Sequence, residues 1–270
     1  MKPIQHLNHS TLQLLNYTLH LADNSLILGH RNSEWTGFGP VLEQDIAISN
    51  IALDLIGQAR NFYQYAAKLI NDSTNQQFNQ STTTEDTLAY LRDAHDFRNC
   101  LLVEQTNGDW AKTILRQFFF STYQYFLYQQ LQNSKDETLA AIAEKSLKEV
   151  TYHLRWSSEW VIRLGDGTEE SHERMLNAID ELWIYTDELF EPADYELIAA
   201  SEGYGVDISI LKKDWEKKIK EIFDEATLSF PLDKKTGVRW FGKEGKHSEH
   251  LGYILAEMQF LQRAYSNSEW

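Results

Sequence analysis

The chain reads Asn50-Ile51-Ala52-Leu53-Asp54-Leu55-Ile56-Gly57-Gln58-Ala59-Arg60-Asn61 inside a long apolar segment. Four of these residues, separated by four, three and four positions, share one face of a helix: Asn50, Asp54, Gly57 and Asn61. The surrounding periodicity predicts a helix from about Val41 to Ile70, about 45 Å long. A carboxylate such as that of Asp54 is costly on a buried face unless it is paired, hydrogen-bonded or bound to a metal ion. The surroundings of Asp54 therefore bear directly on function.

Helical periodicity also organises the rest of the chain. Three further long helices are predicted at Thr11–Glu34, Trp110–Leu131 and Asp136–Arg163, and turns containing glycine bound them. Shorter helices are predicted at Thr87–Leu91, Asp96–Leu102, Glu169–Leu189, Ile208–Thr227 and Ser248–Tyr265, with a short segment near Tyr195–Glu202. No strand pattern is present. The sequence predicts one all-α domain over residues 1–270, a bundle of four long core helices with additional flanking helices.

Two loops interrupt the helical pattern. Residues 71–84 are polar and are expected to form an exposed loop, and Thr84-Glu85-Asp86 at its end suits a helix start. A second loop, residues 234–246, holds the basic cluster Lys234, Lys235, Arg239, Lys243 and Lys246. This cluster is either a solvated loop or a contact for an acidic partner or for the phosphates of coenzyme A.

Composition narrows the functional classes. Apolar residues make up 42% of the 270 residues, which is typical of a folded domain with a sizeable core. The formal net charge of −15 argues against binding to nucleic acid or to an anionic membrane, because phosphates would be repelled. Cys100 is the single cysteine, so no internal disulfide is expected, and neither a signal peptide nor a membrane-spanning run is recognised. These features predict a cytoplasmic protein.

The long helices are arranged as in bundles that hold a carboxylate-bridged pair of iron ions. Such sites take one carboxylate from each of two helices and Glu-x-x-His from each of the other two. The corresponding positions here are Asp23, Asp54, Gly57, Phe120, Glu149 and Tyr152, with His153 one residue beyond the expected histidine. Glycine and phenylalanine cannot ligate iron, and three acids without a well-placed imidazole make a poor iron site. We therefore expect no catalytic residue, no cofactor and no working metal site in this chain.

Three interpretations of the remaining acids stay open. Asp54 lies on an exposed face or in a solvated seam between helices, or the acids are the remnant of a metal site. Alternatively, Asp23, Asp54, Glu149 and His153 bind iron or manganese and activate oxygen in this chain. Antiparallel packing of the first two helices is expected to bring Asp23 and Asp54 to a similar depth.

Two smaller groups of residues are also candidates. His247 and His250 are three residues apart, with Glu257 two turns further on, and they either bind a metal ion or cap a helix and contact a partner. Arg60 or Arg116 would offer the acids a buried ion pair in place of a metal.

Five stretches together resemble one family: Tyr17–Asn24, Asn50–Asn61, Leu101–Gln105, Lys148–Arg155 and His247–Arg263. They resemble the C-subunit (PaaC-type) family of the bacterial ring 1,2-phenylacetyl-CoA epoxidase, a multicomponent monooxygenase of phenylacetate degradation. The second and the last of these stretches are specific, and together the five are spread over nearly the whole chain.

The resemblance implies a ferritin-like, structural subunit without a di-iron centre. Such a subunit pairs with and stabilises a homologous catalytic subunit that holds the di-iron centre and the substrate. A small bridging subunit and a reductase with iron–sulfur and flavin cofactors complete the complex, which epoxidises the aromatic ring with NADPH and O2. For the isolated chain a homodimer is a further option. The alternatives are a dimetal-binding oxygenase in its own right and an acyl-CoA-binding helical module.

Overall fold

Four long helices form the core of the fold. The computed structural model describes residues 7–74, 82–231, 241–265 and 268, and no strand occurs within these ranges. The core helices are α1 (His9–Ser33), α2 (Leu42–Thr74), α5 (Trp110–Leu131) and α6 (Glu137–Gly165). Each begins within two residues of its predicted start. The prediction of an all-α, ferritin-like bundle is confirmed.

Aspartate caps fix where two of these helices begin. Asp109 accepts a hydrogen bond from the Lys112 backbone N–H (3.0 Å) at the start of α5. Asp136 accepts hydrogen bonds from the backbone N–H groups of Thr138 (3.0 Å) and Leu139 (2.9 Å) at the start of α6. These N–H groups belong to the first turn of a helix and have no partner within it, so the caps stabilise the two starts.

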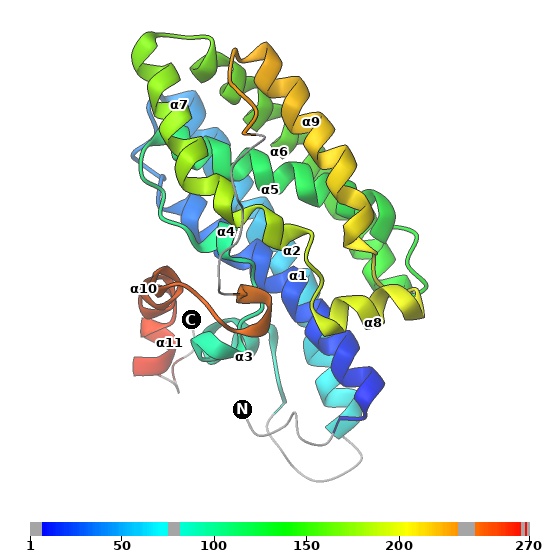
Figure 1. The fold of residues 1–270 in the computed structure, drawn as a ribbon. Coiled ribbons are helices and arrows are strands. Elements are labelled where there is room, and N and C mark those ends of the chain that lie inside the picture. The colour runs from blue at the N-terminus through cyan, green and yellow to red at the C-terminus, as the bar shows by residue number, and fades with distance from the viewer. Residues whose placement is uncertain (1–6, 75–81, 232–240, 266–267, 269–270) are drawn as a thin grey trace.

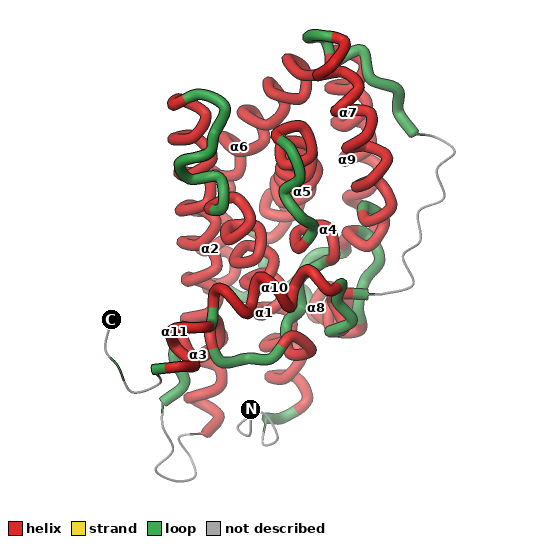
Figure 2. The backbone as a smooth tube through the Cα atoms, turned by 90° about the vertical axis from the view of Figure 1, so that its left-hand side faces the viewer, coloured by secondary structure: helices red, strands yellow, loops and turns green. Residues whose placement is uncertain are grey.

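Two antiparallel hairpins build the bundle (Figure 1). Helix α1 packs along α2, helix α5 packs along α6, and α2 also contacts α6. The shorter helices are α3 (Glu85–Tyr90), α4 (Leu101–Glu104), α7 (Glu169–Leu182), α8 (Asp194–Glu202), α9 (Lys212–Glu225), α10 (Glu249–Met258) and α11 (Phe260–Ala264). Helices α7 and α9 cover α5 and α6, α8 packs on α1, and α10 crosses over α1 on the side that faces the viewer in Figure 2.

Several predicted helices differ in their bounds, among them Ile208–Thr227, which the structure divides into a 3₁₀ turn and α9 (Lys212–Glu225). A 3₁₀ turn (Ala94–Asp96) and α4 replace a continuous helix from Asp96, because the intervening backbone is extended and bonds to α1 side chains. There the Arg98 N–H donates to Asp23 (2.7 Å) and the Cys100 N–H to Asn24 (2.8 Å). Helix α7 ends at Leu182, and two 3₁₀ turns come after it, at Trp183–Tyr185 and Asp187–Leu189. The predicted last helix is divided at Gln259 into α10 and α11. Further 3₁₀ turns lie at Ile208–Leu211 and Gly242–Glu244.

Buried aromatic side chains fill the contact between α5 and the flanking helices. Phe119 lies within 6 Å of both Trp183 and Trp215, with ring-centroid distances of 5.7 and 5.6 Å. The Trp215 indole N–H donates to the Phe119 carbonyl (2.9 Å), so the polar edge of this buried ring is also satisfied. None of the helices in the described ranges is long and apolar enough to span a membrane.

Candidate functional site

The predicted ligand positions of α2 and α6 lie along one seam between these helices. His153 Nε2 lies 3.0 Å from Asp54 Oδ2, and Gln58 donates a hydrogen bond to Glu149 Oε2 (2.9 Å). His153 and Gln58 are buried, whereas the two acids are half-buried. Each acid of this α2–α6 seam therefore already has a partner within the protein.

Of the remaining ligand positions, Gly57 and Phe120 carry no metal-binding group, and Tyr152 lies on the exposed side of α6. Gly57 is exposed, and a Cβ placed on it would meet no heavy atom within 4 Å. Tyr152 is 38% exposed, whereas Phe120 is buried beside Tyr123. Successive helix positions differ by about 100°, so the residue that turns inward from α6 is His153 and not Tyr152.

The polar stripe of α2 is a largely exposed face. Asn50 and Gly57 are exposed, and Asp54 and Asn61 are half-buried. The inward positions of this stretch carry apolar side chains: Ile51, Leu55 and Ala59. Of the open interpretations, the structure favours a solvated seam, because helical spacing shows which residues share a face but not which way that face points.

Asp23 lies apart from this seam, in a buried ion pair. Both terminal nitrogens of Arg92 donate to its carboxylate, the Nη1–Oδ2 distance being 3.0 Å. The Tyr63 hydroxyl donates to Oδ1 (2.5 Å) and the Arg98 N–H to Oδ2 (2.7 Å). Burial lowers the pKa of Arg92, but the charge and hydrogen bonding of Asp23, with smaller contributions from Tyr63 and Asp96, together raise this pKa above its ordinary value. The pair is therefore buried and held by several hydrogen bonds inside the fold.

The expectation that Asp23 and Asp54 lie at a similar depth is wrong. Tyr63 of α2 reaches Asp23, whereas a Cβ on Gly29, six residues later in α1, would lie 3.1 Å from Ile56. The hairpin register thus places Asp23 opposite Tyr63, nine residues or about 13 Å along α2 from Asp54. Sequence length alone could not reveal this offset, because it depends on how the turn between the helices packs.

Three further buried glutamates hold loop segments against the bundle: Glu104, Glu188 and Glu196. Glu188 accepts hydrogen bonds from the backbone N–H groups of Leu101 (2.6 Å) and Gly242 (2.6 Å). Burial raises the pKa of Glu188 to about 7, and these N–H donors only partly offset the shift. One side chain thus connects two segments that are far apart in the sequence.

The basic loop contributes an internal ion pair. Lys243 Nζ lies 3.1 Å from Glu196 Oε2, both side chains are buried, and Nζ also donates to the Glu191 carbonyl (2.9 Å). Lys246 is exposed and pairs with Glu244 (3.0 Å). The other three members lie outside the described residues: Lys234, Lys235 and Arg239. Lys243 is therefore not available to an external phosphate or to an acidic partner.

His247 and His250 do not form a metal-binding pair on one helix. His247 precedes α10, and its Nδ1 lies 2.8 Å from Glu104 Oε2. The Ser248 N–H donates to the other carboxylate oxygen of Glu104 (2.7 Å). Burial lowers the pKa of His247. The hydrogen bond to Glu104 and its charge raise this pKa by more than burial lowers it, so the net shift is upward. This pair attaches the start of α10 to α4.

Sequence reasoning missed the counter-ion of Asp23. The candidates Arg60 and Arg116 lie elsewhere: Arg60 is exposed beside Glu85 (3.4 Å), and Arg116 donates to the Gln105 carbonyl (2.5 Å). The true partner, Arg92, is 69 residues from Asp23 and comes after a short helix with no periodic signal of its own. In the sequence Arg92 follows a short apolar stretch and precedes Asp93, a pattern that is too common to be diagnostic.

The residues present do not fit a di-iron centre. Among the described side chains, no group of three or more His, Cys, Asp or Glu is arranged to hold a metal ion. His153 Nδ1 and Gln58 Oε1 are buried without a hydrogen-bond partner in the protein, yet one imidazole nitrogen and one amide oxygen are no substitute for the six ligands of such a site. A buried water molecule, which needs polar partners of this kind, would satisfy them.

Comparison with known proteins shows the family of this chain. Residues 2–270 match the family described as phenylacetic acid catabolic protein. The chain belongs to this family. One relative is the C subunit of the 1,2-phenylacetyl-CoA epoxidase of Escherichia coli (strain K12), which is 46% identical over 258 residues, covering 96% of this chain and 99% of the relative. The resemblance seen in the sequence is therefore confirmed, and membership in the phenylacetic acid catabolic protein family extends over nearly the whole chain.

Proposed function

We propose that this chain is the structural, non-catalytic subunit of a cytoplasmic di-iron monooxygenase that epoxidises the ring of phenylacetyl-CoA. It pairs with the homologous catalytic subunit and stabilises it. The di-iron centre belongs to that catalytic subunit, and the iron–sulfur and flavin cofactors belong to the reductase. A small bridging subunit completes the complex.

The observation that carries this proposal is that the acids at the predicted ligand positions are already bonded to other side chains of the protein. Asp23 is neutralised by Arg92, and Asp54 and Glu149 bond to His153 and Gln58. A side chain that is already bonded within the fold has to give up that partner before it can bind iron. Breaking a buried ion pair costs about 3–5 kcal/mol, so the Asp23 carboxylate in particular is held away from metal chemistry.

The same contacts suit a supporting role. Buried ion pairs with complete hydrogen bonding hold the segments between helices in one arrangement, and a rigid subunit binds a partner with a smaller entropic cost. In this role the chain contributes shape and burial to the complex, and the oxygen chemistry takes place on the catalytic subunit.

Metal content tests the proposal. The purified chain is loaded anaerobically with ferrous iron and desalted, and bound iron is compared with that of the catalytic subunit treated in the same way. We expect near-zero iron on this chain, and turnover by the reconstituted complex that needs both subunits and survives Asp54→Asn. About two irons per chain, lost on Asp54→Asn, would show instead that this subunit is itself an oxygenase.

A further inference from the structure

The outer face of α2 exposes apolar side chains over much of its length. Leu42 is 71% exposed, Ile46 52% and Leu53 66%, and these residues recur at helical spacing. The strip from Leu42 to Gly57 is about 23 Å long at 1.5 Å per residue. Single exposed apolar residues are common, but several on one side of a helix, here with the exposed Asn50 beside them, favour a binding surface.

The turn before α2 holds an exposed aromatic ring in a fixed place. Asp45 accepts hydrogen bonds from the backbone N–H groups of Gly37 (2.8 Å) and Gly39 (3.0 Å), the residues on either side of Phe38. Phe38 is nevertheless 76% exposed. An aromatic side chain presented on a hydrogen-bonded turn loses little further entropy on binding, which favours its use as an anchor for a partner.

Two exposed glycines lie within helices α2 and α10. Gly57 in α2 and Gly252 in α10 are both exposed, and a Cβ on either would meet no heavy atom within 4 Å. Glycine destabilises a helix interior relative to alanine, and nothing within the described chain requires its small size at these two positions. Close approach of another backbone would explain both glycines.

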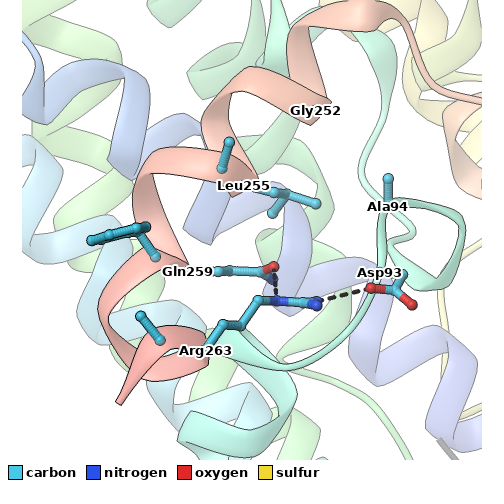
Figure 3. A pocket seen from close by; sticks show the side chains of 9 residues that line it. Asp93, Ala94, Gly252, Leu255, Gln259 and Arg263 are labelled. Carbon is cyan, nitrogen blue, oxygen red and sulfur yellow. Dashed lines mark hydrogen bonds and ion pairs between the residues drawn. The ribbon is translucent and has the colours of Figure 1, made fainter. Parts of the chain in front are cut away.

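Helix α10 and the start of α11 also expose large apolar side chains. Tyr253 is 67% exposed and Phe260 62%. Beside them lies a groove of about 550 Å³, which runs between α10–α11 and the segment at Asp93 and Ala94 (Figure 3). Arg263 donates to Gln259 (2.9 Å) and to Asp93 (2.9 Å), so the polar groups of the groove are already paired and its free surface is mainly apolar.

Helices α2 and α10 both pack on α1. Ile56 of α2 packs at Gly29 of α1, and α10 contacts α1 as well. One helix about 10 Å wide and 23 Å long covers far less than the roughly 800 Å² that each partner buries in a stable complex. A partner that binds tightly therefore has to cover both helices.

We propose that this combined surface, the docking face, binds the homologous catalytic subunit through one of its helices. The docking face consists of Phe38, Leu42, Ile46, Leu53, Tyr253 and Phe260, with Gly57 and Gly252 as the points of closest approach. This inference rests on the proposed function, because it locates the pairing that the function requires.

Charge favours a different subunit over a second copy of this chain. Two copies would bring together net charges of −15 each. Glu43 and Glu257, both exposed, lie beside the apolar residues, and no Lys or Arg of the described chain forms an ion pair with either. A partner surface that is apolar at its centre and basic at its rim is complementary to the docking face.

The test measures binding of the full-length chain to the purified catalytic subunit. Leu53→Arg places a charge at the centre of the docking face, and Gly57→Leu fills the point of closest approach. Leu197→Arg is the matched control, because Leu197 is 54% exposed on α8, across the molecule from α10 in Figure 1. Light scattering gives the oligomeric state of each variant, and thermal unfolding confirms that it is folded.

We expect Leu53→Arg and Gly57→Leu to weaken binding at least about 10-fold, with unchanged or higher melting temperatures, and Leu197→Arg to bind as the wild type does. Wild-type affinity in both docking-face variants would overturn the inference and leave the proposed function standing. A wild-type chain that does not bind the catalytic subunit would overturn the proposed function and the inference together. A homodimer that Leu53→Arg dissociates, without any effect on the catalytic subunit, would show that the docking face serves self-association instead.

Discussion

Replacing Asp23 by asparagine is expected to lower the free energy of unfolding of the isolated chain by about 3–5 kcal/mol. The Asp23 carboxylate accepts two hydrogen bonds from Arg92, one from Tyr63 and one from the Arg98 backbone. Asparagine has nearly the same shape but a single acceptor oxygen, and its NH2 group would face a donor. The substitution also leaves the Arg92 guanidinium buried without a counter-ion, which is the larger loss.

Thermal and urea unfolding monitored by circular dichroism would measure this effect. A chain of this size loses about 2–4 °C of melting temperature for each kcal/mol, so a decrease of about 6–20 °C is expected for Asp23→Asn. The matched control is Asp54→Asn, because the Asp54 side chain is 37% exposed and contacts one histidine. An ion pair that open to solvent contributes less than about 1 kcal/mol.

Two results would refute the reasoning about Asp23. The first is a loss for Asp23→Asn no larger than that for Asp54→Asn. The second comes from the double variant Asp23→Leu/Arg92→Met, which removes both charges and is expected to be less destabilised than Asp23→Asn. If the double variant is the less stable of the two, the buried arginine without a counter-ion is not the cause.

Three other predictions concern pH and helix stability. The free energy of unfolding is expected to fall by up to about 3 kcal/mol as the pH rises from about 4.5 to about 7, because folded Glu188 keeps a proton that the unfolded chain has lost. Urea titrations at a series of pH values would measure this fall, and Glu188→Gln should remove it. The His247 pKa is raised by Glu104, so its stabilising contribution is present below pH 6.5 and is lost as the pH rises through the folded pKa; a pH profile that His247→Gln leaves unchanged would contradict this. Gly57→Ala should stabilise the isolated chain by about 0.5–1 kcal/mol, since the alanine Cβ would meet no heavy atom within 4 Å. A lower melting temperature of this variant would contradict the prediction.

Much of the helical framework could be predicted from the sequence, because its signals are local. Asp109 and Asp136 cap helices that begin where the apolar periodicity begins, and Thr84 caps α3 in the same way. The break between Asp96 and Leu101 could not be predicted. It depends on backbone hydrogen bonds to side chains of α1, and those contacts exist only after the chain has folded.

At the candidate site, too, local features could be predicted from the sequence and contacts between distant residues could not. Spacing correctly grouped Asp54 with Gly57 on one face of α2, and it placed His153 one step beyond the histidine position of α6. It could not show that the α2 face is largely exposed, or that Asp23 binds Arg92 some 13 Å along the hairpin from Asp54. Both facts depend on the register between helices, which residues distant in the sequence decide.

Asp23, one of the acids at the predicted ligand positions, is explained by the segment that it holds in place, and other buried acids hold segments in the same way. In a di-iron bundle the metal ions connect helices through their ligands. Here the buried acids connect helices to the segments between them: Asp23 holds residues 92–98, Glu104 holds residues 247–248, and Glu188 holds residues 101 and 242. Two of these contacts fix the approach to α10, which carries Gly252 and Tyr253 of the docking face. A buried carboxylate removed from this chain would therefore weaken the complex indirectly, through the position of α10, whereas Leu53→Arg would weaken it directly and leave the stability of the chain intact.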